Sequence, residues 1–159
     1  MIIKGRALKY GDDINTDVII PGRYLEITDS DELSSHCMED LDSKFFYKYK
    51  KGDIIIAGKN FGCGSSREQA VICLKQIGIG AVIAKSFSRI FYRNAINQGL
   101  IIVESFEAVD FIQNMDELEI NLDDSYIFNK TKNQYFKINP LPAFMQNIIN
   151  HGGLINTIK

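Results

Sequence analysis

The sequence has few cysteines, no long apolar run and no strong excess of one charge, and each shortage removes a class of protein. Its three cysteines, Cys37, Cys63 and Cys73, form no CxxC or other ligand cluster, so neither a zinc site nor a disulfide framework is expected. No apolar run approaches the roughly 20 residues that cross a bilayer. The net charge is only −2 and the lysines and arginines are scattered, so we expect no nucleic-acid partner and no membrane surface.

Size and composition are those of an ordinary water-soluble protein. The chain has 159 residues, of which 45% are hydrophobic and 24% charged. This length supports one domain, 1–159, with a sizeable core. Residues 1–5 lack the long apolar region of a signal peptide, so a cytoplasmic location is the expectation.

The middle of the chain alternates between strand-like and helix-like segments. We expect strands at 53–58, 80–84 and 100–104, separated by helices at 66–77 and 87–98. Ser86 is a candidate N-cap of the second helix, and Gly99 is expected to end it. A βαβαβ order predicts a parallel sheet with right-handed crossovers. Ligands of such sheets bind beyond the carboxyl ends of the strands.

The two ends of the chain complete the predicted fold. Residues 2–9 are expected to form a strand, and 30–37 and 40–49 to form helices. Period-two alternation at 117–122, 126–129 and 135–138 predicts an antiparallel meander, followed by a last helix at 142–150. The predicted fold class is therefore α/β, a three-layer β/β/α domain with a parallel sheet and a separate, smaller antiparallel sheet.

The segment after the strand at 53–58 carries the densest set of reactive side chains. Residues 60–68 read Asn-Phe-Gly-Cys-Gly-Ser-Ser-Arg-Glu, so a glycine-bearing turn leads from a strand into a helix. Such a turn points backbone N–H groups and the positive end of a helix dipole at an anion. Ser65 and Ser66 add hydroxyls, and Arg67 adds a guanidinium. We expect this turn to bind a small carboxylate.

A purely structural interpretation of the same turn is also open. Ser65 and Glu68 have the S-x-x-E spacing of a capping box, which would only close the first turn of the helix. Arg67 favours the functional interpretation, because a cation in the first helical turn opposes the dipole unless an anion offsets it. The glycines at 62 and 64 also let a ligand approach the backbone closely.

Three further interpretations of this turn and its surroundings are weaker. The spacing is a broken dinucleotide fingerprint and lacks the Gly-Lys-Ser/Thr of a P-loop. Cys63 near a helix N-terminus could react as a thiolate, but no histidine lies nearby in the sequence, and a small residue in a tight turn is the simpler account. Residues 12–17 lack the ligand order of a calcium loop. We expect instead that Thr16 or Asp17 orients the hydroxyls of the site.

A second helix also begins at the carboxyl end of a strand. Arg89 and Arg93 lie one turn apart on one face of the helix expected at 87–98, so both could reach an anion or a partner. An ordinary surface role for this pair of charges stays equally open.

Taken together, these segments resemble the small subunits of 3-isopropylmalate dehydratase, which are the swivelling domains of the aconitase superfamily. The resemblance is carried by residues 11–17, 23–25, 58–68 and 84–94, in order, and runs over nearly the whole chain. It implies a β/β/α swivelling domain that works with a large subunit, as a heterodimer or heterotetramer. In that family the large subunit carries a [4Fe–4S] cluster whose open iron binds the substrate. No cofactor or metal is then expected in this chain.

The resemblance also implies roles for individual residues. Ser65 corresponds to the general base that removes a proton alpha to a carboxylate, and Asp17 to an active-site aspartate. Arg67 corresponds to a residue that holds a substrate carboxylate, and Ser66 to a hydrogen-bond donor. The chain departs from the family at Gln69, where relatives usually carry histidine.

The segment Tyr24-Leu25-Glu26-Ile27-Thr28 corresponds to the loop that selects the substrate. It carries no lysine or arginine to hold a third carboxylate, and Glu26 would repel one. Leu25 and Ile27 could line an apolar slot, and Tyr24 is expected to lie beside the substrate. An alkyl-substituted malate is therefore favoured over citrate or homocitrate.

The predicted function is the small subunit of a hydro-lyase that interconverts 2-isopropylmalate and 3-isopropylmalate in leucine biosynthesis. Methylmalate and dimethylmalate stay open as substrates, because an apolar slot discriminates one methylene by only about 1–3 kcal/mol. A homoaconitate hydratase subunit and a stand-alone binding module for small carboxylates also stay open.

Overall fold

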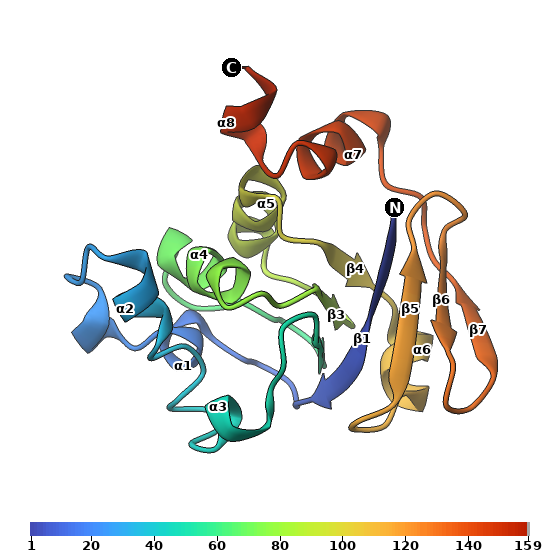
Figure 1. Ribbon diagram of the computed structural model, residues 1–159, viewed down its shortest axis with the longest axis horizontal. Coiled ribbons are helices and arrows are strands. Elements are labelled where there is room, and N and C mark those ends of the chain that lie inside the picture. Colours follow the sequence, from blue (N-terminus) through green and yellow to red (C-terminus); the bar gives the residue numbers. More distant parts are fainter. Residues whose placement is uncertain (159) are drawn as a thin grey trace.

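One mixed sheet of seven strands organises the computed structural model, which describes residues 1–158 (Figure 1). The strand order is β4-β3-β2-β1-β5-β6-β7. The strands are β1 (Ile2–Lys9), β2 (Ile54–Ala57), β3 (Ala81–Ala84), β4 (Ile102–Glu104), β5 (Glu117–Asn121), β6 (Tyr126–Asn129) and β7 (Gln134–Lys137). Strands β1 to β4 pair in parallel and β5 to β7 antiparallel, which confirms the predicted parallel unit and the predicted meander.

Eight helices, of which the last two follow β7, and one 3-10 turn accompany these strands in the described part of the chain. They are α1 (Thr16–Ile19), η1 (Gly22–Tyr24), α2 (Ser30–Ser34), α3 (Phe45–Lys48), α4 (Glu68–Gln76), α5 (Arg89–Gln98), α6 (Phe106–Phe111), α7 (Ala143–Asn150) and α8 (Leu154–Thr157). Gly99 ends α5 in the left-handed conformation, as predicted. The predicted cap Ser86 is wrong, because Ser88 is the N-cap and its hydroxyl accepts from Phe91 N at 3.3 Å. No helix among residues 1–158 is long and apolar enough to cross a membrane.

The prediction of a separate antiparallel sheet is wrong, because β1 belongs to both halves. Residues 2–6 of β1 pair antiparallel with β5, and residues 7–9 pair parallel with β2. The strand passes close to the chain at Gly52, and a Cβ on Gly5 would lie only 2.0 Å from the Gly52 carbonyl oxygen. An eight-residue strand with a glycine at the crossing can therefore serve two neighbours in succession.

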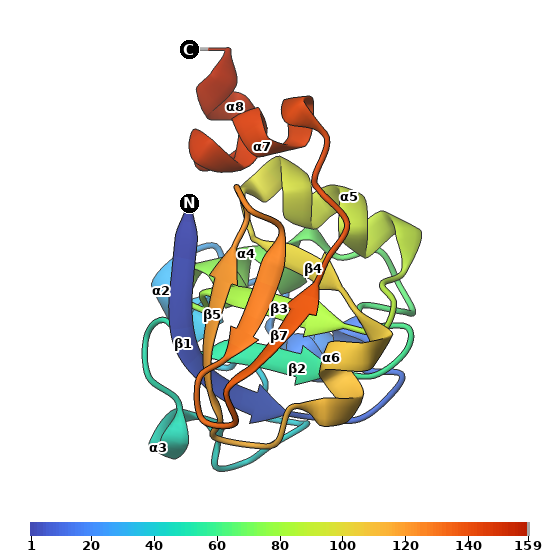
Figure 2. The same ribbon diagram turned by 90° about the vertical axis from the view of Figure 1, so that its right-hand side faces the viewer.

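The sheet curls, so that its antiparallel half covers one face of its parallel half (Figures 1 and 2). On one face of the parallel strands, Ile55 and Val82 pack with α4, α5 and the segments before β2. On the other face, Ile54 and Ile83 pack with β5 to β7 and α6. The three predicted layers are thus present as helices, parallel strands and antiparallel strands, although one sheet supplies two of them.

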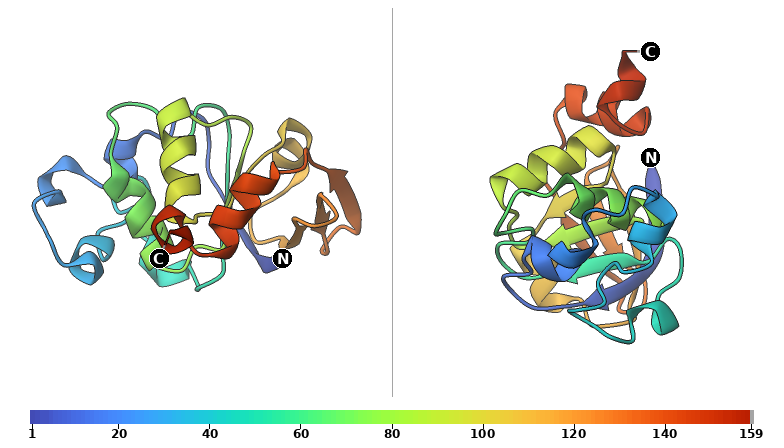
Figure 3. Two further views of the ribbon diagram at one scale, coloured as in Figure 1. Left: turned by 90° about the horizontal axis from the view of Figure 1, so that it is seen from above. Right: turned by 90° about the vertical axis from the view of Figure 1, so that its left-hand side faces the viewer.

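The segments that follow β2 and β3 continue side by side beyond the strands. Phe61 and Phe87 form an isolated parallel bridge, and Phe61 N donates to Ser86 O at 3.0 Å. This pairing carries the chain from β2 toward α4 and from β3 toward α5. Figure 3 shows α1, the turn before α4 and the start of α5 gathered at this end of the parallel strands, where ligands of parallel sheets bind.

Candidate active site

The turn from β2 to α4 depends on glycines at two positions. Gly62 and Gly64 have φ values of +81° and +89°, which side chains other than glycine rarely adopt. A Cβ on Gly62 would also lie 2.2 Å from Cγ of Phe91. Gly62 therefore lets the turn lie directly against α5, and the reactive residues 65–67 follow from that position.

Ser65 does not cap α4, so the predicted capping box is wrong. Helix α4 begins at Glu68, its N-cap is Arg67, and no side chain caps it. Glu68 instead accepts a hydrogen bond from the side-chain amide of Gln98. Ser65 is exposed two residues before the cap, and its hydroxyl has no hydrogen-bond partner among residues 1–158. The structure therefore leaves this hydroxyl free for another role.

Thr16 fastens α1 to the serine turn. Its buried hydroxyl donates to the carbonyl of Ser65 at 2.7 Å, and its backbone N–H donates to Cys63 O at 2.9 Å. On the other side, Gly62 N donates to Ile14 O at 2.8 Å. Thr16 thus positions the backbone of Ser65 rather than its hydroxyl, and α1 brings the next residue, Asp17, to the site.

Arg67 and Asp17, 50 positions apart in the chain, form an ion pair. Nη1 of Arg67 lies 2.5 Å from Oδ1 of Asp17 and donates to Ile20 O at 3.1 Å. The Arg67 side chain is only 16% exposed, whereas that of Asp17 is 60% exposed. A Cβ on Gly22 would lie 3.4 Å from Nη2 of Arg67, so the guanidinium rests against bare backbone. A guanidinium has five donors, and the remaining ones are available to a carboxylate.

A hollow of about 190 Å³ lies between the serine turn and the first turns of α5. Ser66 and Arg67 line it from one side, and Arg89, Ile90 and Asn94 line it from the other. The hollow thus joins the two segments that the sequence placed at carboxyl ends of strands. Arg89 was expected to reach an anion or a partner, but Asn94 was missed. The available signal was its spacing of four residues from Ile90, which places both on one face of α5.

None of residues 24–28, which form the predicted substrate loop, is among the residues that line this hollow. The hydroxyl of Tyr24 donates to Oε1 of Glu39 at 2.5 Å, and its ring stacks on His36 at 3.7 Å. Leu25 packs against the core, whereas Glu26 is exposed. The substrate roles of Tyr24, Leu25 and Glu26 therefore stay predictions.

The sequence did not reveal the cluster that holds Tyr24. Besides Tyr24, Glu39 also contacts His36, whose Nδ1 lies 3.0 Å from Oε2 of Glu39. The hydrogen bond from Tyr24, followed by contacts with His36 and Arg23, lowers the pKa of Glu39. The spacing of His36 and Glu39, three residues apart, was the signal that could have paired them.

None of the three cysteines has the environment of a reactive thiolate. Burial, together with the nearby carboxylate of Asp13, raises the pKa of the Cys63 thiol, the opposite of what a nucleophile at neutral pH requires. Cys37 and Cys73 are fully buried as free thiols with their sulfur atoms 3.1 Å apart. Within residues 1–158, no three histidine, cysteine or acidic side chains come together as a metal site.

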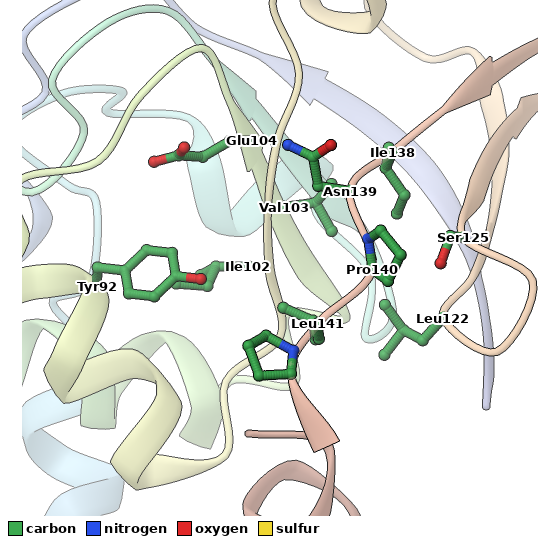
Figure 4. Close-up of a pocket in the computed structure, with 11 residues that line it drawn as sticks. Tyr92, Ile102, Val103, Glu104, Leu122, Ser125, Ile138, Asn139, Pro140 and Leu141 are labelled. Carbon is green, nitrogen blue, oxygen red and sulfur yellow. The ribbon is translucent and has the colours of Figure 1, made fainter. Parts of the chain in front are cut away.

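A second hollow, of about 140 Å³, lies between α5, the end of β4 and residues 138–142 (Figure 4). Figure 4 shows Tyr92 and Glu104 on one side of it and Asn139 to Leu141 on the other. Burial and then the Glu104 carboxylate raise the pKa of Tyr92. Glu104 is the only charged group among its described lining residues. This hollow would therefore repel a carboxylate, and the hollow beside Arg67 is the better candidate.

Comparison with known proteins gives concordant matches. The sequence model of the aconitase C-terminal domain family matches residues 12–108. The 3-isopropylmalate dehydratase small subunit of Caldicellulosiruptor saccharolyticus is 61% identical over 159 residues, which are 100% of this chain and 92% of that protein. That of Clostridioides difficile is 56% identical over 159 residues, 100% of this chain and 98% of the relative.

A solved structure agrees with these sequence relatives. The crystal structure of 3-isopropylmalate dehydratase from Methanocaldococcus jannaschii superposes with a TM-score of 0.94 at 55% identity. The match covers 99% of this chain and 93% of the other. The curled sheet and the positions of the helices are thus those of a known fold.

Proposed function

The chain belongs to the aconitase C-terminal domain family, among the small subunits of 3-isopropylmalate dehydratase, and from this membership we propose that Ser65, Asp17 and Arg67 are its part of the active site. As such a subunit it is a component of a hydro-lyase of leucine biosynthesis, and its partner is a large subunit. We place this enzyme in the cytoplasm and treat residues 1–159 as one swivelling domain. The observation that supports the site assignment is that Ser66 and Arg67 line one hollow, while Asp17 pairs with Arg67 and Thr16 holds the Ser65 backbone next to Ser66.

Ser65 is the proposed general base for the dehydration. The reaction removes a proton from the carbon alpha to one carboxylate and a hydroxyl from the neighbouring carbon, and rehydration places them the other way round. The Ser65 oxygen takes that proton and returns it in the second half. A serine hydroxyl is a weak base, so its deprotonated form needs stabilisation from the Arg67 guanidinium and from the N–H groups at the start of α4.

Arg67 and Ser66 are the proposed binding groups. Arg67 is already held by Asp17 and by the carbonyl of Ile20, so its guanidinium is oriented before the substrate arrives. A planar guanidinium matches a carboxylate with two parallel hydrogen bonds. Ser66 lines the same hollow and supplies a hydroxyl donor. Asp17 therefore acts by fixing the direction of Arg67.

The family implies a [4Fe–4S] cluster, and the residues of this chain do not fit one. Such clusters are held by several cysteine thiolates. Cys37 and Cys73 lie in the core, and Cys63 stands alone on the turn. We propose that the cluster belongs to the large subunit and that the two chains assemble as a heterodimer or heterotetramer. The small dicarboxylate substrate then lies between them.

The substrate is proposed to be an alkyl-substituted malate, with isopropylmalate as the leading candidate. Residues 24–33 include the segment that corresponds to the substrate-selecting loop of the family, and they contain no lysine or arginine to hold a third carboxylate. Glu26 is exposed and would repel a third carboxylate that approached it.

Replacing Ser65 tests the central assignment. With the large subunit under anaerobic conditions, Ser65→Ala should lower turnover of isopropylmalate by about 10³-fold, because general bases contribute about 10²–10⁴-fold. The variant should still co-elute with the large subunit. Ser35→Ala is the matched control, since that exposed hydroxyl only donates to Glu32 O. Turnover by Ser65→Ala within a few fold of wild type would refute the assignment.

A further inference from the structure

We propose that the groove between α5 and α7 is a docking site for a segment of the large subunit that combines acidic and aliphatic side chains. The identity of the partner rests on the proposed function. The groove itself rests on observations separate from the catalytic turn. Figures 1 and 2 show α7 above α5, and the two helices are in contact.

The groove is apolar at its base. It encloses about 270 Å³, and Ile96, Phe144, Met145 and Ile148 line it. Ile148 and Met145 also pack against the core beneath. Phe144, in contrast, is 63% exposed. An aromatic ring beside an apolar groove on the surface is typical of a protein interface.

Two uncompensated positive charges flank this groove. Arg89 and Arg93 are exposed on α5 and line the groove. Neither side chain has an ion pair or a hydrogen bond among residues 1–158, and neither α5 nor α7 contains an acidic residue. Like charges four residues apart destabilise a helix, and a cation in the first turn of α5 opposes the dipole. An acidic partner would relieve both costs.

The groove adjoins the catalytic hollow. Arg89 lines both, together with the first turns of α5. A chain that covers the hollow and contacts Arg89 therefore also reaches the edge of the groove. This adjacency to the proposed active site favours the large subunit over a second copy of this chain or an unrelated protein.

A binding measurement without substrate tests the proposal. The small subunit is titrated into fluorescently labelled large subunit, and the half-saturating concentration is read from anisotropy. Arg93→Glu should raise it by about tenfold or more, as expected for an arginine hot spot, and Phe144→Ser should raise it several-fold. At saturating small subunit, both variants should keep turnover within about twofold of wild type. Added salt should weaken wild-type binding more than that of Arg93→Gln, because the lost pair is screened.

Matched surface variants and Ser65→Ala complete the design. Lys130→Glu and Tyr135→Ser change an exposed charge and an exposed aromatic ring on the antiparallel half, and they should bind as wild type. Ser65→Ala should also bind as wild type, so an error in the catalytic assignment leaves this test intact. Binding of Arg93→Glu and Phe144→Ser within twofold of wild type would overturn the proposal. So would a change confined to self-association of the isolated small subunit, measured by sedimentation.

Discussion

Arg67 is the residue at which the separate parts of the site meet. Its guanidinium contacts Asp17 of α1 and the carbonyl of Ile20, and it rests against Gly22. Nη1 makes both polar contacts, which leaves Nε and Nη2 to meet a substrate carboxylate. A lysine carries the same charge but has a single ammonium nitrogen instead of a planar fork, so it cannot keep both contacts and also present a second nitrogen to the substrate.

We therefore expect Arg67→Lys to lower kcat/KM for isopropylmalate by about 10–100-fold. The expected loss equals one charge-assisted hydrogen bond, which contributes about 1.5–3 kcal/mol. Steady-state kinetics of the reconstituted enzyme measure it. Arg23→Lys is the matched control, because Arg23 binds Glu39 and Asp40 at the surface away from the hollow. A value for Arg67→Lys within threefold of wild type would show that a charge alone suffices.

The sequence identified the types of residue at the site better than their partners. Ser65, Ser66 and Arg67 follow from a local pattern, namely a glycine turn before a helix. The pair between Arg67 and Asp17 depends on the bridge between Asn15 and Cys63, which no local pattern encodes. The same holds for Tyr24, whose hydroxyl is directed to Glu39 by the packing of residues 22–39.

At the scale of elements, the contact between the serine turn and α5 shapes the hollow. Gly62 supplies both the left-handed backbone and the space for Phe91. Ser88 reinforces this contact, because its hydroxyl donates to Gly62 O at 2.9 Å. The turn and the start of α5 therefore behave as one structural unit.

Gly62→Ala should destabilise the protein by about 2–5 kcal/mol. About 1–2 kcal/mol comes from the left-handed conformation and about 1–3 kcal/mol from the overlap with Phe91. Urea unfolding measures the change. Gly11→Ala is the control, since a Cβ at Gly11 meets nothing within 4 Å. An unchanged urea midpoint for Gly62→Ala would mean that the turn can move away from α5 at no cost.

Most elements were predictable from periodicity, and the errors at their ends have local physical causes. The helix expected at 40–49 shrinks to α3, and the chain just before it turns at Met38, whose φ is +66°. The start of α4 moves from 66 to Glu68 because the backbone of Arg67 is extended, with φ −136° and ψ 107°. A residue inside an α-helix would need φ and ψ of about −60° and −45°.

At the scale of the whole molecule, β1 joins the parallel and the antiparallel strands into one sheet. The sequence predicted both the parallel unit and the meander, because each has its own periodicity. It did not predict their joining, since the choice of neighbours on the two sides of β1 is set by contacts far apart in the chain. Nothing in the sequence of residues 2–6 and 7–9 assigns the two parts of β1 to different neighbours, yet they pair with β5 and β2 respectively.

Asp116 secures the antiparallel half next to this shared strand. Its carboxylate is buried and accepts from Lys132 Nζ at 2.5 Å, Asn129 Nδ2 at 2.8 Å and Gln113 N at 2.8 Å. Its carbonyl accepts from Ala7 N of β1 at 2.8 Å. Burial alone would raise the pKa of Asp116, but the hydrogen bonds from Lys132, Gln113 and Asn129 outweigh it and lower the pKa.

Asp116→Ala should therefore destabilise the whole molecule, by about 3 kcal/mol as expected when one partner of a buried pair is removed. Because β1 couples the halves, amide exchange should accelerate as much in β3 as in β6. The folded pKa is lowered, so the contribution of Asp116 is complete above its unfolded pKa of about 3.9 and is lost as the pH falls below that value. The urea midpoints of wild type and variant should accordingly converge in acid.

Asp110→Ala, which removes an exposed partner of Lys85, should change stability far less. Faster exchange confined to β5 to β7 would instead mean that the halves unfold separately, and that the shared strand does not bind them into one cooperative unit.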